Sequence, residues 1–144
     1  MSTPTVDVMI PVLNEAHVLE KSVRTVREFC AANLPYRCRV VVVDNGSTDG
    51  TQDVAQRLKE QFPADVDFYS LAERGRGRAL RYAWTRSSAD VCAYMDVDLS
   101  TELAALRKIV DPILHDGYDV ATGSRLHKGK SRVTRSLKRY FLSK

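Results

Sequence analysis

The chain has 144 residues, of which 44% are hydrophobic and 28% charged, and its formal net charge is +4. This length supports one domain with a hydrophobic core, and no apolar run approaches the roughly 18 residues of a membrane span. The opening Met1–Pro4 has neither the basic region nor the apolar stretch of a secretory signal, so nothing in it indicates secretion.

The charge is unevenly distributed. Residues 125–144 contain 8 of the 22 Lys and Arg and none of the 18 Asp and Glu, which gives a net charge of +8. Residues 1–124 contain the other 14 Lys and Arg and all 18 Asp and Glu, which gives a net charge of −4. We therefore expect a folded unit over 1–124 and a basic tail over 125–144. The tail favours an anionic partner, such as phosphate groups or an acidic membrane surface. It lacks interleaved aromatics apart from Tyr140 and Phe141, so we do not expect nucleic acid binding.

Apolar periodicity predicts strands alternating with helices along the chain. The predicted strands are Val6–Leu13, Arg39–Val43, Val66–Leu71, Val91–Val97 and Asp119–Gly123. The predicted helices are Asn14–Ala31, Asp49–Gln61, Arg76–Ser87 and Thr101–His115. We expect Asn14 to cap the first helix, Ser47 or Thr48 to cap the second, and Gly117 to end the fourth. Trp84 of the third helix is expected to lie in the core. The three cysteines (Cys30, Cys38 and Cys92) lack Cys-x-x-Cys spacing and are expected to be reduced core residues.

Strand–helix alternation predicts an α/β fold with a mostly parallel sheet and helices on both faces. Ligands of such sheets bind outside the carboxyl ends of the strands. Polar, glycine-rich and acidic segments follow the predicted strands, so this edge is the expected ligand site.

Asp96 and Asp98 end the apolar run that begins at Val91. If the run is a strand, both carboxylates point the same way and repel each other unless a cation lies between them. Oxygen ligands at such a place suit Mg²⁺ or Mn²⁺ bridging to substrate phosphates. Taken alone, the pair could also be a solvated surface turn or a helix cap.

Three other segments follow predicted strands. Asp44 could accept hydrogen bonds from a base or ribose, or could simply form a turn. The loop Arg74–Arg78 has two glycines and opens a helix, which favours phosphate, although a flexible basic loop is the alternative. Residues 123–131 lack the glycine spacing of a P-loop, but Arg125 is a candidate phosphate partner.

Together these motifs resemble glycosyltransferase family 2, and within it the dolichyl- or polyprenyl-phosphate sugar synthases. Five segments resemble family motifs in order: Pro11–Glu15, Val42–Thr51, Gly75–Ala79, Tyr94–Thr101 and Gly123–Arg125. The resemblance implies a GT-A fold and inverting transfer of a hexose from UDP-glucose or GDP-mannose to a polyprenyl phosphate. It also implies a location at the cytoplasmic face of a membrane.

The resemblance also implies roles for individual residues. Asp96 and Asp98 would bind Mg²⁺ or Mn²⁺, and Asp98 and Arg125 would act in catalysis. The donor contacts would be Pro11, Leu13, Glu15, Asp44, Gly77, Arg78 and Asp96.

Two residues depart from the family pattern: Asn45 stands in place of a second aspartate, and Leu13 stands where many members have tyrosine. Family members usually continue for many tens of residues, so we expect a C-terminally truncated piece that binds donor but transfers weakly. The alternatives are a non-catalytic nucleotide- or membrane-binding module and a HAD-type phosphatase. The phosphatase is disfavoured because no Asp or Glu follows Asp119.

Overall fold

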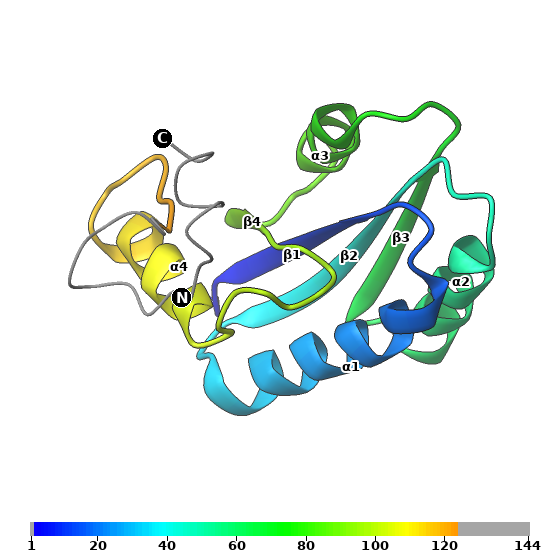
Figure 1. The fold of residues 1–144 in the computed structure, drawn as a ribbon. Helices are drawn as coiled ribbons and strands as arrows, with labels where there is room; N and C mark the ends of the chain where they lie inside the picture. The colour runs from blue at the N-terminus through cyan, green and yellow to red at the C-terminus, as the bar shows by residue number, and fades with distance from the viewer. Residues whose placement is uncertain (1, 124–144) are drawn as a thin grey trace, which may run out of the picture.

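A computed structural model describes residues 2–123 as a four-stranded parallel sheet covered by helices (Figure 1). The strand order is β3-β2-β1-β4. In chain order the elements are β1 (Thr5–Val12), α1 (Ala16–Asn33), β2 (Arg37–Asn45), α2 (Thr51–Gln61), β3 (Val66–Leu71), α3 (Arg76–Trp84), β4 (Val91–Tyr94) and α4 (Ala105–His115). The predicted α/β class with a mostly parallel sheet is confirmed.

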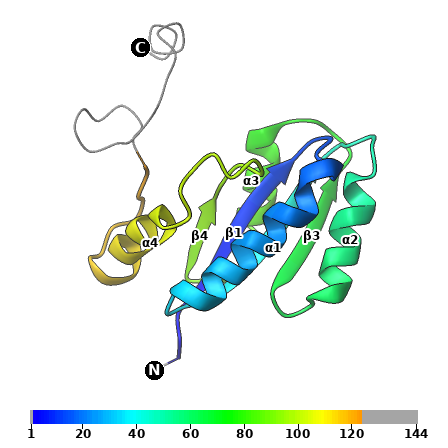
Figure 2. The same ribbon diagram turned by 60° about the horizontal axis from the view of Figure 1, so that its bottom comes forward.

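The sheet is buried on both faces because its central strands are nearly continuous runs of β-branched residues. Val8, Ile10 and Val42 face a large cluster with α1, α2 and α4, while Met9 and Val41 face a smaller cluster with α3. Figures 1 and 2 show α1 and α2 on one side of the sheet and α3 on the other. Leu19, Val23, Val26 and Cys30 recur at helical spacing in the sequence of α1, and all four are buried.

Some local predictions are wrong. Trp84 is 41% exposed and contacts Tyr94 edge-to-face instead of entering the core, because the smaller Leu80 and Ala83 already fill the contact of α3 with the sheet. Residues 119–123 form no strand within the described part of the chain. A strand needs a bonded neighbour and a buried face, and Val120 is 80% exposed.

Gly117 follows α4 with φ +76°, as its predicted capping role requires.

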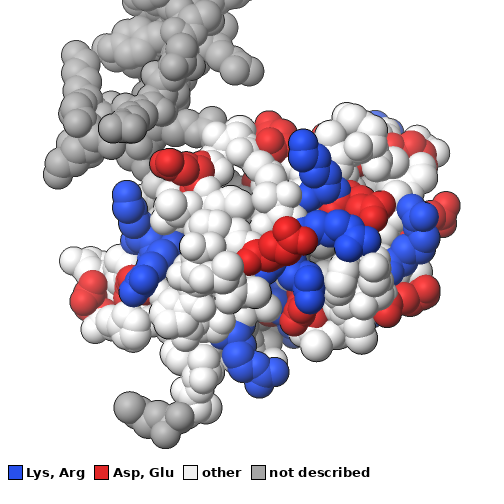
Figure 3. Space-filling view, turned by 90° about the horizontal axis from the view of Figure 1, so that it is seen from below, with Lys and Arg blue, Asp and Glu red and all other residues white. Residues whose placement is uncertain are grey.

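The outer surface of the α1 side has interleaved charges, with basic and acidic side chains next to one another (Figure 3). Arg24 pairs with Glu20 at 2.9 Å and Arg27 pairs with Asp65 at 2.7 Å. None of the helices in residues 2–123 combines the length and the apolar character that crossing a membrane requires.

A charge network lies at the amino-terminal half of the sheet, where Arg39 of β2 binds the buried Asp7 of β1 through two hydrogen bonds of 2.7 and 3.0 Å. Asp67 of β3 pairs with Lys59 at 2.9 Å and with Arg39 at 3.5 Å. Burial by itself raises the pKa of Asp67, but the hydrogen bonds from Lys59 and the Phe68 N–H, with the nearby positive charges, outweigh it and lower the pKa below its ordinary value. The hydrogen bonds that Arg39 donates to Asp7 raise the pKa of Arg39.

This network predicts how stability changes with pH. A carboxyl whose pKa is lowered by folding stabilises the fold above its ordinary pKa of about 3.9, and that contribution is lost as the pH falls through the folded-state pKa. We expect Asp67→Asn to lower the free energy of unfolding by about 1 kcal/mol at pH 7, measured by urea denaturation. The gap to the unsubstituted chain should close between about pH 4 and pH 2.

The control is Asp119→Asn, at an exposed position near the end of the described residues. It should leave the unfolding curve unchanged. An Asp67→Asn deficit of equal size at pH 2.5 and pH 7 would contradict the electrostatic explanation.

Candidate functional site at the carboxyl edge of the sheet

The strand register brings the polar segments to one edge. Val12, the last residue of β1, lies opposite Asp44, which lies opposite Ser70. On the other side of β1, Tyr94 lies opposite Met9, and the Met95 N–H donates to the Met9 carbonyl at 3.0 Å. The segments after all four strands therefore begin along the same edge, as predicted.

Asp44 is fully buried at the end of β2. Its carboxylate accepts hydrogen bonds from the Ser47 N–H at 3.1 Å, the Gln52 side-chain amide at 2.8 Å and the Ser70 hydroxyl at 3.1 Å. These three donors compensate for burying a charge, which would otherwise be costly. In this arrangement Asp44 holds the turn after β2, and its contact with a nucleotide stays a prediction.

The opening motif forms the loop between β1 and α1, and Pro11, Leu13 and Glu15 are all partly buried there. The Glu15 N–H donates to the Thr51 hydroxyl at 2.9 Å, which ties the loop to the first residue of α2. The contacts of these three residues with a donor are not tested by this geometry and stay predictions.

The predicted N-terminal caps of the first two helices are wrong. Asn14 does not cap α1: its φ is +54°, and its side-chain oxygen accepts the N–H groups of Thr48 at 2.8 Å and Asp49 at 3.3 Å. Ser47 accepts the Asn14 N–H at 2.8 Å instead of capping α2, whose N-cap is Gly50. Both polar side chains bond between the two loops, because the register places those loops side by side.

The glycine-rich segment opens α3 beside the end of β2. Asn45 accepts the Gly75 N–H at 2.7 Å, so the amide found in place of an aspartate fixes the start of this helix. Gly77 has open space around its Cα, which permits close approach of a ligand. Arg78 is exposed and pairs with Glu73. The segment thus presents an accessible helix N-terminus at the predicted ligand edge.

Asp96 and Asp98 follow β4, which ends at Tyr94, three residues earlier than predicted. The burial alternation nevertheless continues: Met95 and Val97 are buried, whereas Tyr94, Asp96 and Asp98 are not. The Asp96 carbonyl accepts the Leu99 N–H at 3.3 Å, and the Asp98 carboxylate accepts the Ser100 N–H at 3.0 Å. Both acids therefore lie on the non-core side of a tight turn.

The acidic pair fits a divalent cation that keeps other ligands. No group of three or more His, Cys, Asp or Glu side chains that could enclose a metal occurs in residues 2–123. Mg²⁺ and Mn²⁺ sites commonly use one or two carboxylates, with waters and substrate phosphates completing the shell. The residues present thus suit a cation that arrives with a phosphate-bearing substrate.

Arg76 is a site residue that the sequence analysis did not single out. It is the first residue of α3, and its guanidinium pairs with the Asp96 carboxylate. The only signal in the sequence was its position between two glycines, which does not show that α3 starts beside the end of β4.

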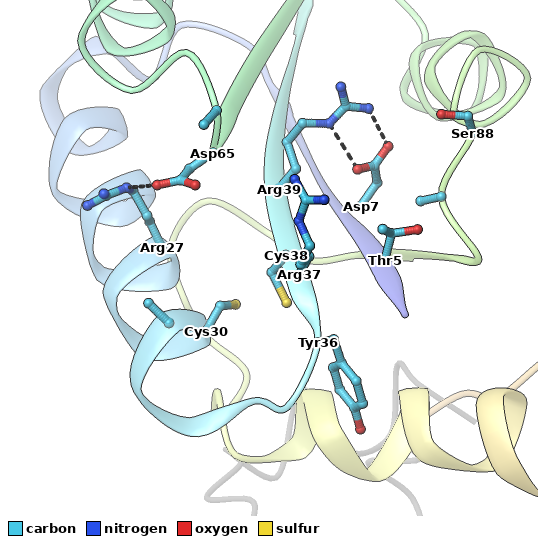
Figure 4. A pocket seen from close by; sticks show the side chains of 13 residues that line it. Thr5, Asp7, Arg27, Cys30, Tyr36, Arg37, Cys38, Arg39, Asp65 and Ser88 are labelled. Atoms are coloured by element: carbon cyan, nitrogen blue, oxygen red, sulfur yellow. Dashed lines mark hydrogen bonds and ion pairs between the residues drawn. The ribbon is translucent and has the colours of Figure 1, made fainter. Parts of the chain in front are cut away.

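The remaining predicted features lie elsewhere. Arg125 and the basic tail 125–144 are outside the described residues. A cavity of about 480 Å³ lies at the opposite end of the sheet, where Thr5 and Arg37 begin β1 and β2 (Figure 4). Cys30 and Cys38 line this cavity as free thiols. Their mutual hydrogen bond raises the pKa of Cys30 and lowers that of Cys38.

Fold and site together define a class: an α/β protein that presents an acidic pair and a helix N-terminus at the carboxyl edge of its sheet. A family model described as glycosyl transferase family 2 matches residues 7–143. The chain belongs to this family, and its fold is the GT-A fold, so both sequence predictions are confirmed.

Two curated relatives illustrate the match. Glycosyltransferase AglD of Haloferax volcanii is 35% identical over 83% of this chain and 19% of its own length. A dolichol-phosphate mannosyltransferase of Pyrococcus furiosus is 34% identical over 86% of this chain and 34% of its own length. The chain therefore spans about a fifth to a third of these proteins.

Solved structures give the same result. The mannosyltransferase PcManGT of Pyrobaculum calidifontis, in complex with GDP-Man and Mn²⁺, is 30% identical with a TM-score of 0.58, covering 67% of this chain and 28% of that one. The glucosyl-3-phosphoglycerate synthase of Mycobacterium tuberculosis, in complex with Mn²⁺ and UDP-glucose, is 25% identical with a TM-score of 0.57. The match covers 78% of this chain and 40% of that one.

The bond between the first two loops generates a prediction at Asn14. Asn14→Gly keeps the positive φ but removes the side-chain acceptor, and should lower the free energy of unfolding by about 1 kcal/mol. Asn14→Ala removes the acceptor and also strains the left-handed backbone, which adds about another 1 kcal/mol. Urea denaturation of both variants separates the two contributions. Equal stability of Asn14→Gly and the unsubstituted chain would show that the acceptor contributes nothing.

Proposed function

We propose that this chain is the donor-binding part of a metal-dependent, inverting glycosyltransferase that moves a hexose from UDP-glucose or GDP-mannose to a polyprenyl phosphate. The observation that carries the proposal is the pair Asp96 and Asp98. It follows β4 at the same sheet edge as Asp44 and the start of α3, in a chain of family 2.

The names of related proteins support the choice of substrates. They include a dolichol-phosphate mannosyltransferase and a bactoprenol glucosyl transferase, the latter 26% identical over 85% of this chain. The related structures contain GDP-Man or UDP-glucose together with Mn²⁺. Either nucleotide, and either Mg²⁺ or Mn²⁺, is compatible with the residues present.

The chemistry follows from the charges. A nucleoside diphosphate leaves readily only if its developing negative charge is stabilised, and a bound Mg²⁺ or Mn²⁺ supplies that stabilisation. Asp96 and Asp98 would hold the cation, and the N–H groups at the start of α3, around Gly77 and Arg78, would face the diphosphate. Pro11, Leu13, Glu15 and Asp44 would line the nucleoside side of the site.

The acceptor is already an anion, so it needs less help from a general base than an alcohol would. Arg125 and the basic residues after it would receive the lipid phosphate by charge attraction, at the cytoplasmic face of a membrane. We do not retain the phosphatase alternative, because the chain belongs to family 2.

Calorimetry tests donor binding directly. We expect UDP-glucose or GDP-mannose to bind the 144-residue chain in the presence of Mn²⁺, and chelation of the metal to abolish that binding. Asp96→Asn should weaken donor binding by more than about tenfold, because even groups that only orient metal ligands are worth 10- to 100-fold.

The matched control is Asp116→Asn, at an exposed position just after α4. It should bind donor like the unsubstituted chain. If neither nucleotide-sugar binds under any metal condition, the proposal is wrong for this chain.

The basic tail gives a second measurement. We expect the chain to sediment with vesicles containing anionic lipid at low salt and to be released at about 0.5 M salt, where surface charges are screened. A variant with the eight Lys and Arg of residues 125–144 replaced by Gln should stay in the supernatant at all salt concentrations. Equal sedimentation of the two proteins would assign the binding to another surface.

A further inference from the structure

The Arg76–Asp96 ion pair places an internal cation on a proposed metal ligand. The contact joins the first residue of α3 to the turn after β4, with the guanidinium Nη2 on the Asp96 Oδ1 atom. The Arg76 side chain is 57% exposed and that of Asp96 is 40% exposed. Both side chains are therefore partly exposed and neither is fixed in the core, while the Asp96 Oδ1 atom itself is buried.

An aromatic contact positions Arg76. Its guanidinium carbon lies 6.0 Å from the ring centroid of Tyr94, the last residue of β4. The same ring contacts Trp84, at the far end of α3, edge-to-face with the centroids 6.3 Å apart. Arg76 and Trp84 thus contact Tyr94 from the two ends of one helix, which holds the guanidinium over the segment that carries the acidic pair.

The two acids differ in this respect. Asp96 has the guanidinium, whereas Asp98 forms no ion pair with any residue in the described range 2–123. A divalent cation bound by both acids would lie on the same Asp96 carboxylate that Arg76 already pairs with. Two positive groups at one carboxylate repel each other, so binding of the metal and retention of the ion pair oppose each other.

We propose that Arg76 is a positioning residue that competes with the divalent cation for Asp96 and is released when the donor diphosphate binds. This inference rests on the proposed function. Released from Asp96, the guanidinium remains at the N-terminus of α3, where a diphosphate would meet both its charge and the helix N–H groups. Metal and diphosphate then favour each other's binding. The metal displaces Arg76 from Asp96 and so frees it for the diphosphate, and the diphosphate holds Arg76 away from the metal site.

The proposal predicts opposite effects of one substitution. Arg76→Gln should tighten the binding of Mn²⁺ alone by about two- to fivefold, the range expected for losing an exposed ion pair. The same substitution should weaken the binding of UDP or GDP in the presence of Mn²⁺. By linkage, the factor by which nucleotide tightens Mn²⁺ binding must then shrink. A residue that merely supported the fold would weaken both ligands together.

The experiment measures free Mn²⁺ by electron paramagnetic resonance, with and without UDP or GDP, using the 144-residue chain. Arg76→Lys keeps the positive charge and should behave like the unsubstituted chain. Arg81→Gln, at an exposed position on α3, is the matched control and should change neither affinity. Thermal unfolding of each variant checks that the fold is unchanged.

The possible results separate the two proposals. Tighter Mn²⁺ and weaker nucleotide binding in Arg76→Gln, with Arg81→Gln unchanged, supports competition at Asp96. Unaltered Mn²⁺ affinity in Arg76→Gln, while Asp96→Asn abolishes Mn²⁺ binding, overturns the role of Arg76 and leaves the proposed function standing. Absence of Mn²⁺ binding in every protein, with and without nucleotide, overturns both.

Discussion

The site depends on a fully buried carboxylate, Asp44, at the end of the second strand. A buried charge is tolerated only when its hydrogen bonds are made, and the donors of Asp44 come from three places: the turn after β2, the first helical turn of α2, and β3. Satisfying one carboxylate therefore requires all three segments to be in place. This constraint makes the carboxyl edge of the sheet a defined surface instead of a set of independent loops.

Three further contacts link the remaining segments of that edge to one another. Asn14 joins the loop after β1 to the loop after β2, Asn45 joins the end of β2 to the start of α3, and Arg76 joins α3 to the turn after β4. The first two use neutral amides and the third uses opposite charges. An amide link does not depend on a ligand's charge, whereas an ion pair responds to any cation or anion that enters. Of these three contacts, the one beside β4, where the acidic pair lies, is therefore the most sensitive to charged ligands.

The strands and their order of alternation with helices could be predicted from sequence because burial on both sheet faces leaves continuous β-branched runs such as Val40–Val43. The positions of Asp96 and Asp98 followed from the same periodicity, which persists beyond the last hydrogen-bonded residue of β4. The predictions that failed concern polar side chains that have two possible sets of hydrogen-bond partners. Asn14 is as suitable for capping its own helix as for bonding a neighbouring loop, and only the register of β1 with β2 decides between them.

Trp84 and Arg76 show a second limit of sequence inference. Helical spacing places Trp84 beside Leu80 on the apolar side of α3, but the contact of α3 with the sheet is completed by small side chains, so the indole lies at its margin against Tyr94. Arg76 contacts the same ring from the other end of the helix. Trp84, which is not buried in the core, therefore contributes to the packing of α3 against β4. That docking is what brings a guanidinium to Asp96, so the exposure of Trp84 and the charge balance of the acidic pair have a common structural cause.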